Sequence, residues 1–205
     1  MSENTGSAKK KLSATAIIII VVAVIAVWAI GQYNKLVALD ENVANQWGNV
    51  ENVYQRRADL IPNLVNTVKG AAEFEKSTLE SVINARAAAT QTKIDASSLT
   101  EENLAAFQAA QGELGAALGR LIAVTENYPE LKANENFQEL QAQLEGTENR
   151  ITVARRDFNE AVRPYNSKIR RFPTNLIANI FGFDKKAYFE AEEGAEQAPD
   201  VEFNF

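Results

Sequence analysis

Residues 33–61 read YNKLVALDENVANQWGNVENVYQRRADLI, and this stretch decides the fold class. Its large apolar side chains recur at steps of three, four and seven residues, which places them on one face of a helix. They are Leu36, Val43, Trp47, Val50, Tyr54 and Ile61. A period of this kind is typical of helices that pack nearly parallel to their neighbours. We therefore expect a long helix within an all-α protein.

Three further stretches carry the same helical period. They are residues 62–91, 101–127 and 134–171. No stretch alternates apolar and polar residues between turn signals, so we expect no sheet. Thr100 and Asn134 are of the residue types that cap helix N-termini, and each stands just before or at the start of a helical stretch. The sequence thus predicts a bundle of helices.

Pro62 is the ambiguous point of this prediction. The stretch before it, Asp59-Leu60-Ile61, suits a helix start, because proline in a first turn loses no hydrogen bond. The alternative is a kink in one continuous helix of roughly 60 residues and ~90 Å. Matching this helix in length to the others favours a true turn at Pro62, and we expect one.

The stretch before residue 33 predicts a membrane anchor. Residues 12–30, LSATAIIIIVVAVIAVWAI, hold no charge, and as a helix they would span ~28 Å of a hydrocarbon core of ~30 Å. A cleaved signal peptide would have a shorter apolar region and a small-residue cleavage site, which this stretch lacks. Only Gly31 interrupts the passage into the next helix, so we expect the two to be nearly continuous.

Three lysines, Lys9 to Lys11, lie directly before the apolar stretch. The positive-inside rule then places the N-terminus in the cytoplasm and the bundle on the outer, periplasmic side of the inner cell membrane. We divide the chain into a cytoplasmic tail, a transmembrane anchor, the bundle with a short helix at residues 173–182, and a disordered acidic tail. These divisions are residues 1–11, 12–31, 32–189 and 190–205.

The chain of 205 residues contains neither histidine nor cysteine, and these absences exclude much chemistry. No Ser–His or Cys–His pair, imidazole ligand, zinc knuckle or disulfide can form. The net charge of −6 argues against nucleic-acid binding. We expect no cofactor, no metal and no nucleic-acid partner. An enzyme or metal protein that uses only side chains such as Asp, Glu, Lys and Ser is the least favoured alternative.

Two clusters within the bundle call for an interpretation. The first is charged and comprises Glu145, Glu148, Arg150, Arg155 and Arg156. Carboxylate metal sites in bundles usually add histidine, so we expect salt bridges to Arg56 or Arg57 instead. The second is a stripe of small residues, Gly112, Gly115, Ala116 and Gly119. We expect this stripe to pack closely on another helix of the chain; a partner helix is the alternative.

The candidate interaction surface lies in residues 172–183, FPTNLIANIFGF. Its members are Phe172, Leu176, Ile177, Ile180, Phe181 and Phe183. Basic residues flank it on both sides. Three interpretations stay open: the segment packs on the bundle, lies in the membrane interface, or binds a partner. Further on, the acidic residues 190–205 end in VEFNF, which is apolar enough for a short docking motif.

Several sequence blocks resemble the bacterial LemA family. They are residues 33–37, 56–65, 126–137 (ENYPELKANENF), 144–151 (LEGTENRI) and 172–183, and the resemblance covers about residues 10–190. It implies a membrane-anchored protein whose soluble part is an antiparallel four-helix bundle with long helices, and it implies no enzymatic activity. Where that family often has an aromatic residue and a histidine, this chain has Ala71 and Phe74, so no role based on a histidine applies.

From these observations we expect a non-enzymatic, membrane-anchored scaffold or adaptor of the cell envelope. Its partners would be the lipid bilayer and either other proteins or further copies of itself. A module that binds the membrane surface through residues 172–183 is the principal alternative.

Overall fold

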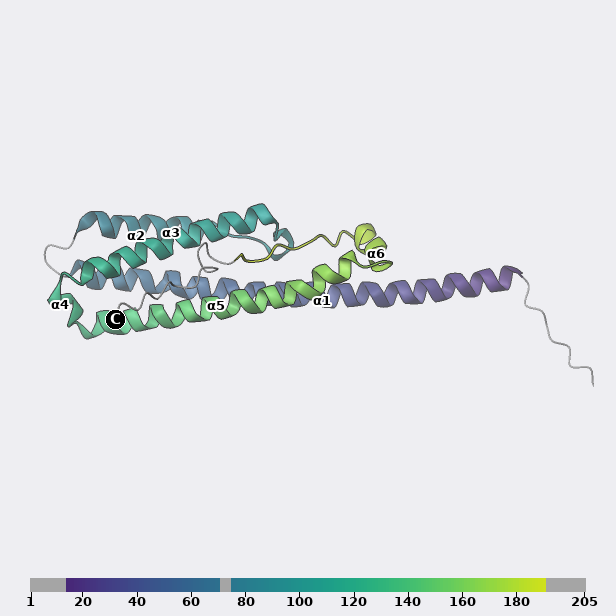
Figure 1. Ribbon diagram of the computed structural model, residues 1–205, viewed down its shortest axis with the longest axis horizontal. Helices are drawn as coiled ribbons and strands as arrows, with labels where there is room; N and C mark the ends of the chain where they lie inside the picture. The colour runs from purple at the N-terminus through teal and green to yellow at the C-terminus, as the bar shows by residue number, and fades with distance from the viewer. Residues whose placement is uncertain (1–13, 71–74, 191–205) are drawn as a thin grey trace, which may run out of the picture.

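The computed structural model describes residues 14–70 and 75–190, and in these ranges all regular structure is helical (Figure 1). The helices are α1 Ala14–Lys69, α2 Lys76–Gln91, the short 3-10 helix η1 Ala96–Ser98, α3 Glu101–Thr125, α4 Pro129–Lys132, α5 Glu135–Arg170 and α6 Thr174–Phe181. The all-α prediction is confirmed. The expected cytoplasmic tail, the lysines before the apolar stretch, the Ala71 and Phe74 positions and nearly all of the acidic tail lie outside the described residues.

The expected turn at Pro62 is wrong, because α1 continues through it. The helix is 56 residues long, with Pro62 inside it, and would measure ~84 Å. An interior proline costs one backbone hydrogen bond and about 3 kcal/mol. Downstream of it, Leu64, Val65 and Val68 are buried on the same face, and this burial offsets the cost. The expected near-continuity across Gly31 is confirmed.

The long helices α1, α2, α3 and α5 lie side by side along one axis, and the N-terminal part of α1 projects beyond the others (Figure 1). The closest pairs are α1 with α5 and α2 with α3, whereas α1 and α2 meet less extensively. The two expected N-caps are confirmed. The Thr100 hydroxyl accepts a hydrogen bond from the Asn103 amide at 3.2 Å, and the Asn134 side-chain Oδ1 accepts one from the Phe137 amide at 3.1 Å.

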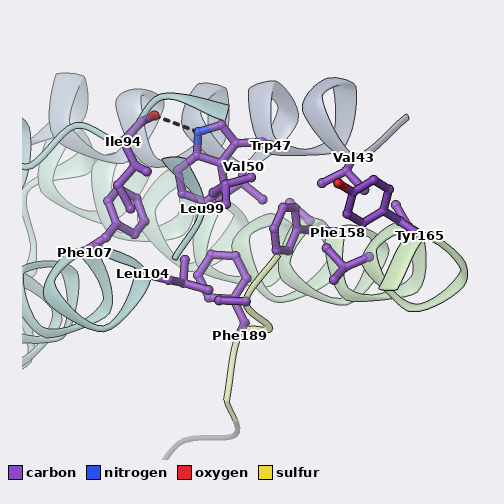
Figure 2. Packing of buried hydrophobic residues seen from close by; sticks show 14 of the residues in the cluster. Val43, Trp47, Val50, Ile94, Leu99, Leu104, Phe107, Phe158, Tyr165 and Phe189 are labelled. Carbon is purple, nitrogen blue, oxygen red and sulfur yellow. Dashed lines mark hydrogen bonds between the residues drawn. The ribbon is translucent and has the colours of Figure 1, made fainter. Parts of the chain in front are cut away.

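The buried side chains form two clusters along the axis. The proximal cluster, nearer the apolar end of α1, is aromatic and centres on Trp47 (Figure 2). The rings of Phe107 and Phe158 meet the indole edge-to-face at 5.3 and 5.6 Å, and its Nε1 donates to the Ile94 carbonyl at 3.0 Å. The distal cluster is mostly aliphatic, with Leu114 fully buried in it.

Residues 183–190, which we call the strap, return from α6 along α5. The Asn166 side chain bonds both the amide and the carbonyl of Lys186, and the Asn159 side chain does the same for Phe189. Phe189 is buried in the proximal cluster, where it stacks on Trp47 at 6.1 Å (Figure 2). The strap is therefore part of the proximal core.

Candidate functional site

Helix α6 folds back on the helical body and contacts both α1 and α5. Gly182 ends it with φ of 73°, a left-handed conformation that favours glycine. Of the six residues of the candidate surface, two point inward: Ile177 is 6% exposed, and Phe183 packs against the proximal cluster. These two side chains attach the segment to the body.

The other four residues of the candidate surface face outward. Their exposed fractions are 80% for Phe172, 52% for Leu176, 76% for Ile180 and 59% for Phe181. Exposure of this degree is unusual for neighbouring large apolar side chains in a body that is otherwise well packed. We call these four residues the α6 apolar face.

The α6 apolar face lies beside the junction between the apolar stretch and the body. The Tyr33 ring is 4.8 Å from the Phe181 ring and 5.7 Å from the Phe183 ring, centroid to centroid. Upstream of Tyr33, α1 holds a stretch long and apolar enough to cross a membrane, and none of that stretch is buried in the protein. Packing on the body and lying near a membrane are therefore compatible, although the sequence presented them as alternatives.

The basic residues around α6 also fall into two groups, one paired with the body and one exposed. Lys185 pairs with Glu101 at 2.7 Å, and Lys186 pairs with Asp40 at 3.3 Å while also donating to the Ala96 carbonyl. These two lysines hold the strap against the body. Arg170 and Arg171 are exposed at the end of α5.

In the charged cluster, the expected salt bridge is confirmed between Arg57 and Glu148. Arg57 is 3% exposed, and its Nη1 donates to the Glu148 carboxylate at 3.1 Å. Its Nη2 donates to the side chain and the carbonyl of Gln111 at 2.6 and 3.0 Å. The sequence pattern missed Gln111, a buried polar residue on the apolar face of α3. The guanidinium thus links α3 to α5 from its position on α1.

The small-residue stripe does not pack on another helix, and that expectation is wrong. An added Cβ would meet nothing within 4 Å at Gly112 or Gly119, and at Gly115 only the Arg57 Nη1 at 4.0 Å. The stripe instead lines a groove of about 500 Å³ between α3 and α5. Its other lining residues are Tyr54, Arg57, Gln108, Gln111, Leu118, Ile122, Leu144, Glu145, Glu148 and Arg155.

The remaining titratable groups that are perturbed have structural partners. Burial raises the pKa of Tyr165, and its hydroxyl donates to the Asp184 carbonyl at 2.9 Å. The bond from Lys185 lowers the pKa of Glu101. In residues 14–70 and 75–190 no three acidic side chains gather closely enough to hold a metal ion. The contacts of Tyr165 and Glu101 hold the strap against α5 and α3.

Comparison with known proteins gives the family. The sequence matches the LemA family over residues 46–203, which is more than half of the chain. Magnetosome protein MamQ 1 of Paramagnetospirillum magneticum is 29% identical over 187 residues, covering 83% of this chain and 68% of the relative. Protein LemA of Metamycoplasma hominis is 24% identical over 164 residues, covering 80% and 71% respectively. The LemA match begins within α1 and extends past the strap, and on that match this chain belongs to the LemA family.

Proposed function

We propose that the protein is a non-enzymatic, membrane-anchored scaffold or adaptor of the cell envelope, built as an antiparallel four-helix bundle on its anchor. The observation that carries this proposal is the continuity of α1. One helix supplies both the exposed apolar stretch and the buried face formed by residues such as Leu36, Val43 and Trp47. A continuous helix transmits position and orientation, so the bundle would stand on the membrane at a defined angle.

The far end of the molecule is suited to meeting partners. The connection around α4 lies at the opposite end from the apolar stretch (Figure 1), and Lys132, Ala133 and Glu135 are exposed there. The partner would be another protein or a second copy of this chain.

The second candidate function, binding to the membrane surface, is favoured by the α6 apolar face. Fully burying a large apolar side chain contributes about 1.5–3 kcal/mol, so four such side chains at an anchored interface would hold α6 firmly in the headgroup region. Arg170 and Arg171 are exposed close by and would meet anionic headgroups. This binding would fix the tilt of the bundle and is compatible with the scaffold role.

Depth in the bilayer tests this arrangement. Since the chain has no cysteine, Ile180→Cys gives a single site for an environment-sensitive fluorophore in the full chain reconstituted in liposomes. We expect blue-shifted emission that brominated lipids quench. Ala133→Cys, at the far end, is the control and should stay solvent-like. Equal emission from the two sites would contradict a membrane-facing α6.

Orientation needs a separate measurement. We propose that the N-terminus is cytoplasmic and the bundle lies on the periplasmic side of the inner membrane. Ala133→Cys should then react with a membrane-impermeant maleimide in cells whose outer barrier has been made permeable. Reaction only after the inner membrane is lysed would reverse the orientation.

A further inference from the structure

The strap runs antiparallel to α5, toward the groove. Lys186 is bonded by Asn166, Phe189 by Asn159, and the Glu190 carbonyl by Arg155 at 2.8 Å. As residue numbers rise along the strap, those of its partners on α5 fall. The chain therefore leaves the described residues at Arg155 and is heading toward the N-terminal half of α5.

The groove begins where the strap stops. Its wall on α5 extends from Arg155 back to Leu144, and its wall on α3 extends from Gln108 to Ile122. The strap occupies the space beside α5 as far as Arg155, and it also touches the start of α3 through the pair of Lys185 with Glu101. Beyond Arg155, within the part of the chain that the structure describes, the gap between α3 and α5 is open as this groove, and the Arg57 guanidinium crosses it to bond Gln111 and Glu148.

We propose that this groove is the docking site of the chain's own residues 191–205. The segment enters from the end at Arg155, without a turn, and carries its large apolar side chains into the groove. These are Val201, Phe203 and Phe205. Leu118, Ile122 and Leu144 offer the apolar contacts, and the stripe of small residues offers the room.

Length and volume fit this occupant. From Arg155 to Leu144 the α5 wall measures ~16 Å at 1.5 Å per residue. Residues 191–203 can reach up to ~40 Å when extended, so both phenylalanines can lie anywhere along the groove. A volume of about 500 Å³ falls within the roughly 300–1,000 Å³ of pockets that enclose ligands. The tether also gives the segment an effective concentration on the order of mM.

The family match supports the same occupant, because it continues beyond Glu190 to residue 203. The segment is thus shared with the family to that point. The strap covers the gap between α3 and α5 in the proximal half. The docked segment covers the same gap in the distal half. It also closes the groove to any other chain, so a partner that uses the groove has to displace it.

Disulfide trapping in the full chain tests the proposal. The pair Gly119→Cys with Asn204→Cys places one thiol in the groove and one between the two phenylalanines. The matched control pairs Asn204→Cys with Val153→Cys, an exposed position on α5 that lies nearer to the exit of the strap. Under mild oxidation in detergent we expect the groove pair to close within one chain at least tenfold faster than the control.

Equal rates of disulfide formation for the two pairs would overturn the proposal. Disulfide-linked dimers that form faster than the internal disulfide would also overturn it, because a second copy of the chain would then be the occupant. Adding Phe203→Ser and Phe205→Ser to the groove pair should reduce its rate to that of the control. An unchanged rate would show that the phenylalanines do not dock.

A filling variant gives an independent readout. Gly112→Leu adds a side chain where an added Cβ meets nothing within 4 Å, so the protein should fold and the groove should be blocked. We expect glutamyl endopeptidase to cleave after Glu192, Glu193 or Glu196 several-fold faster than in the unaltered chain. The same cleavage rate in both proteins would count against docking in the groove.

Discussion

The two halves of the gap between α3 and α5 differ in what fills them. In the proximal half the strap brings Phe189 against Trp47 and Phe158, and the gap is closed (Figure 2). In the distal half glycines line an open groove. The difference shows that one pair of helices can be joined by a third segment at one end and stay apart at the other.

Arg57 bridges the two helices within the groove. Its guanidinium bonds Gln111 on α3 and Glu148 on α5, so one side chain spans the space that the helices leave between them. Such bonds are charge-assisted and stronger than neutral ones. They link α3 and α5 without drawing their backbones together, and this linkage allows a groove to exist beside a well-packed core.

Removing the centre of the closed half should have the largest effect. Trp47→Ala deletes a side chain that is 1% exposed, and its bond to Ile94, and we expect it to cost about 3–5 kcal/mol of unfolding free energy. Urea unfolding of the detergent-solubilised protein, followed by far-UV circular dichroism, measures this cost. Ile83→Ala, at a side chain 42% exposed, is the control and should cost far less. A similar cost for both would contradict an aromatic core centred on Trp47.

Detaching the strap should have the next largest effect. Asn159→Ala leaves the amide and the carbonyl of Phe189 without their side-chain partners, and we expect a loss of about 2 kcal/mol. Hydrogen exchange at the Phe189 amide should accelerate well before the helices exchange. Asn149→Ala, at an exposed position of the same helix, controls for helix propensity. If the Phe189 amide exchanges at its original rate, the strap is held by something else.

The sequence predicted those features of the molecule that depend on nearby residues in the chain. Periodicity located the buried faces of α1, α3 and α5, and residue type located the caps at Thr100 and Asn134. Charge predicted a salt bridge from the charged cluster to Arg56 or Arg57, and the structure forms it between Arg57 and Glu148. Pro62 was predicted wrongly because the local cost of an interior proline is smaller than the gain from burying Leu64, Val65 and Val68, which depends on other helices.

The groove and the division of the α6 surface could not be predicted, for a related reason. Small residues permit either a close helix contact or an empty space, and only the positions of α3 and α5 decide between them. Ile177 and Phe181 look alike in sequence, yet one is buried and the other lies exposed against Tyr33. The Asn159 and Asn166 side chains that hold the strap carry no sequence signal beyond being polar residues on a helix.

The open half should tolerate, and even gain from, a larger residue. Gly119→Ala adds a methyl group in open space and removes the helix-propensity cost of glycine, so we expect a gain of about 1 kcal/mol. Gly182→Ala is the contrasting variant, because φ of 73° strains any other residue, and it should lose stability. Urea midpoints of the two variants give the comparison. A destabilised Gly119→Ala would mean that another part of the chain occupies the space beside Gly119.

The smallest effect concerns the ion pair where the strap meets α3. Lys185 lowers the pKa of Glu101, so the pair stabilises the fold above the pKa of an ordinary glutamate and loses that contribution as the pH falls through the lowered value. Both side chains are exposed, and salt screens their attraction. Glu101→Gln should therefore lower the urea midpoint slightly at pH 7. The difference from the unaltered chain should vanish at a pH below the lowered pKa, because the carboxyl is then neutral in both proteins. Glu102→Gln removes the same charge one residue away, and its urea midpoint should not converge with that of the unaltered chain in this way. If it does converge, the effect comes from net charge and not from the pair of Lys185 with Glu101.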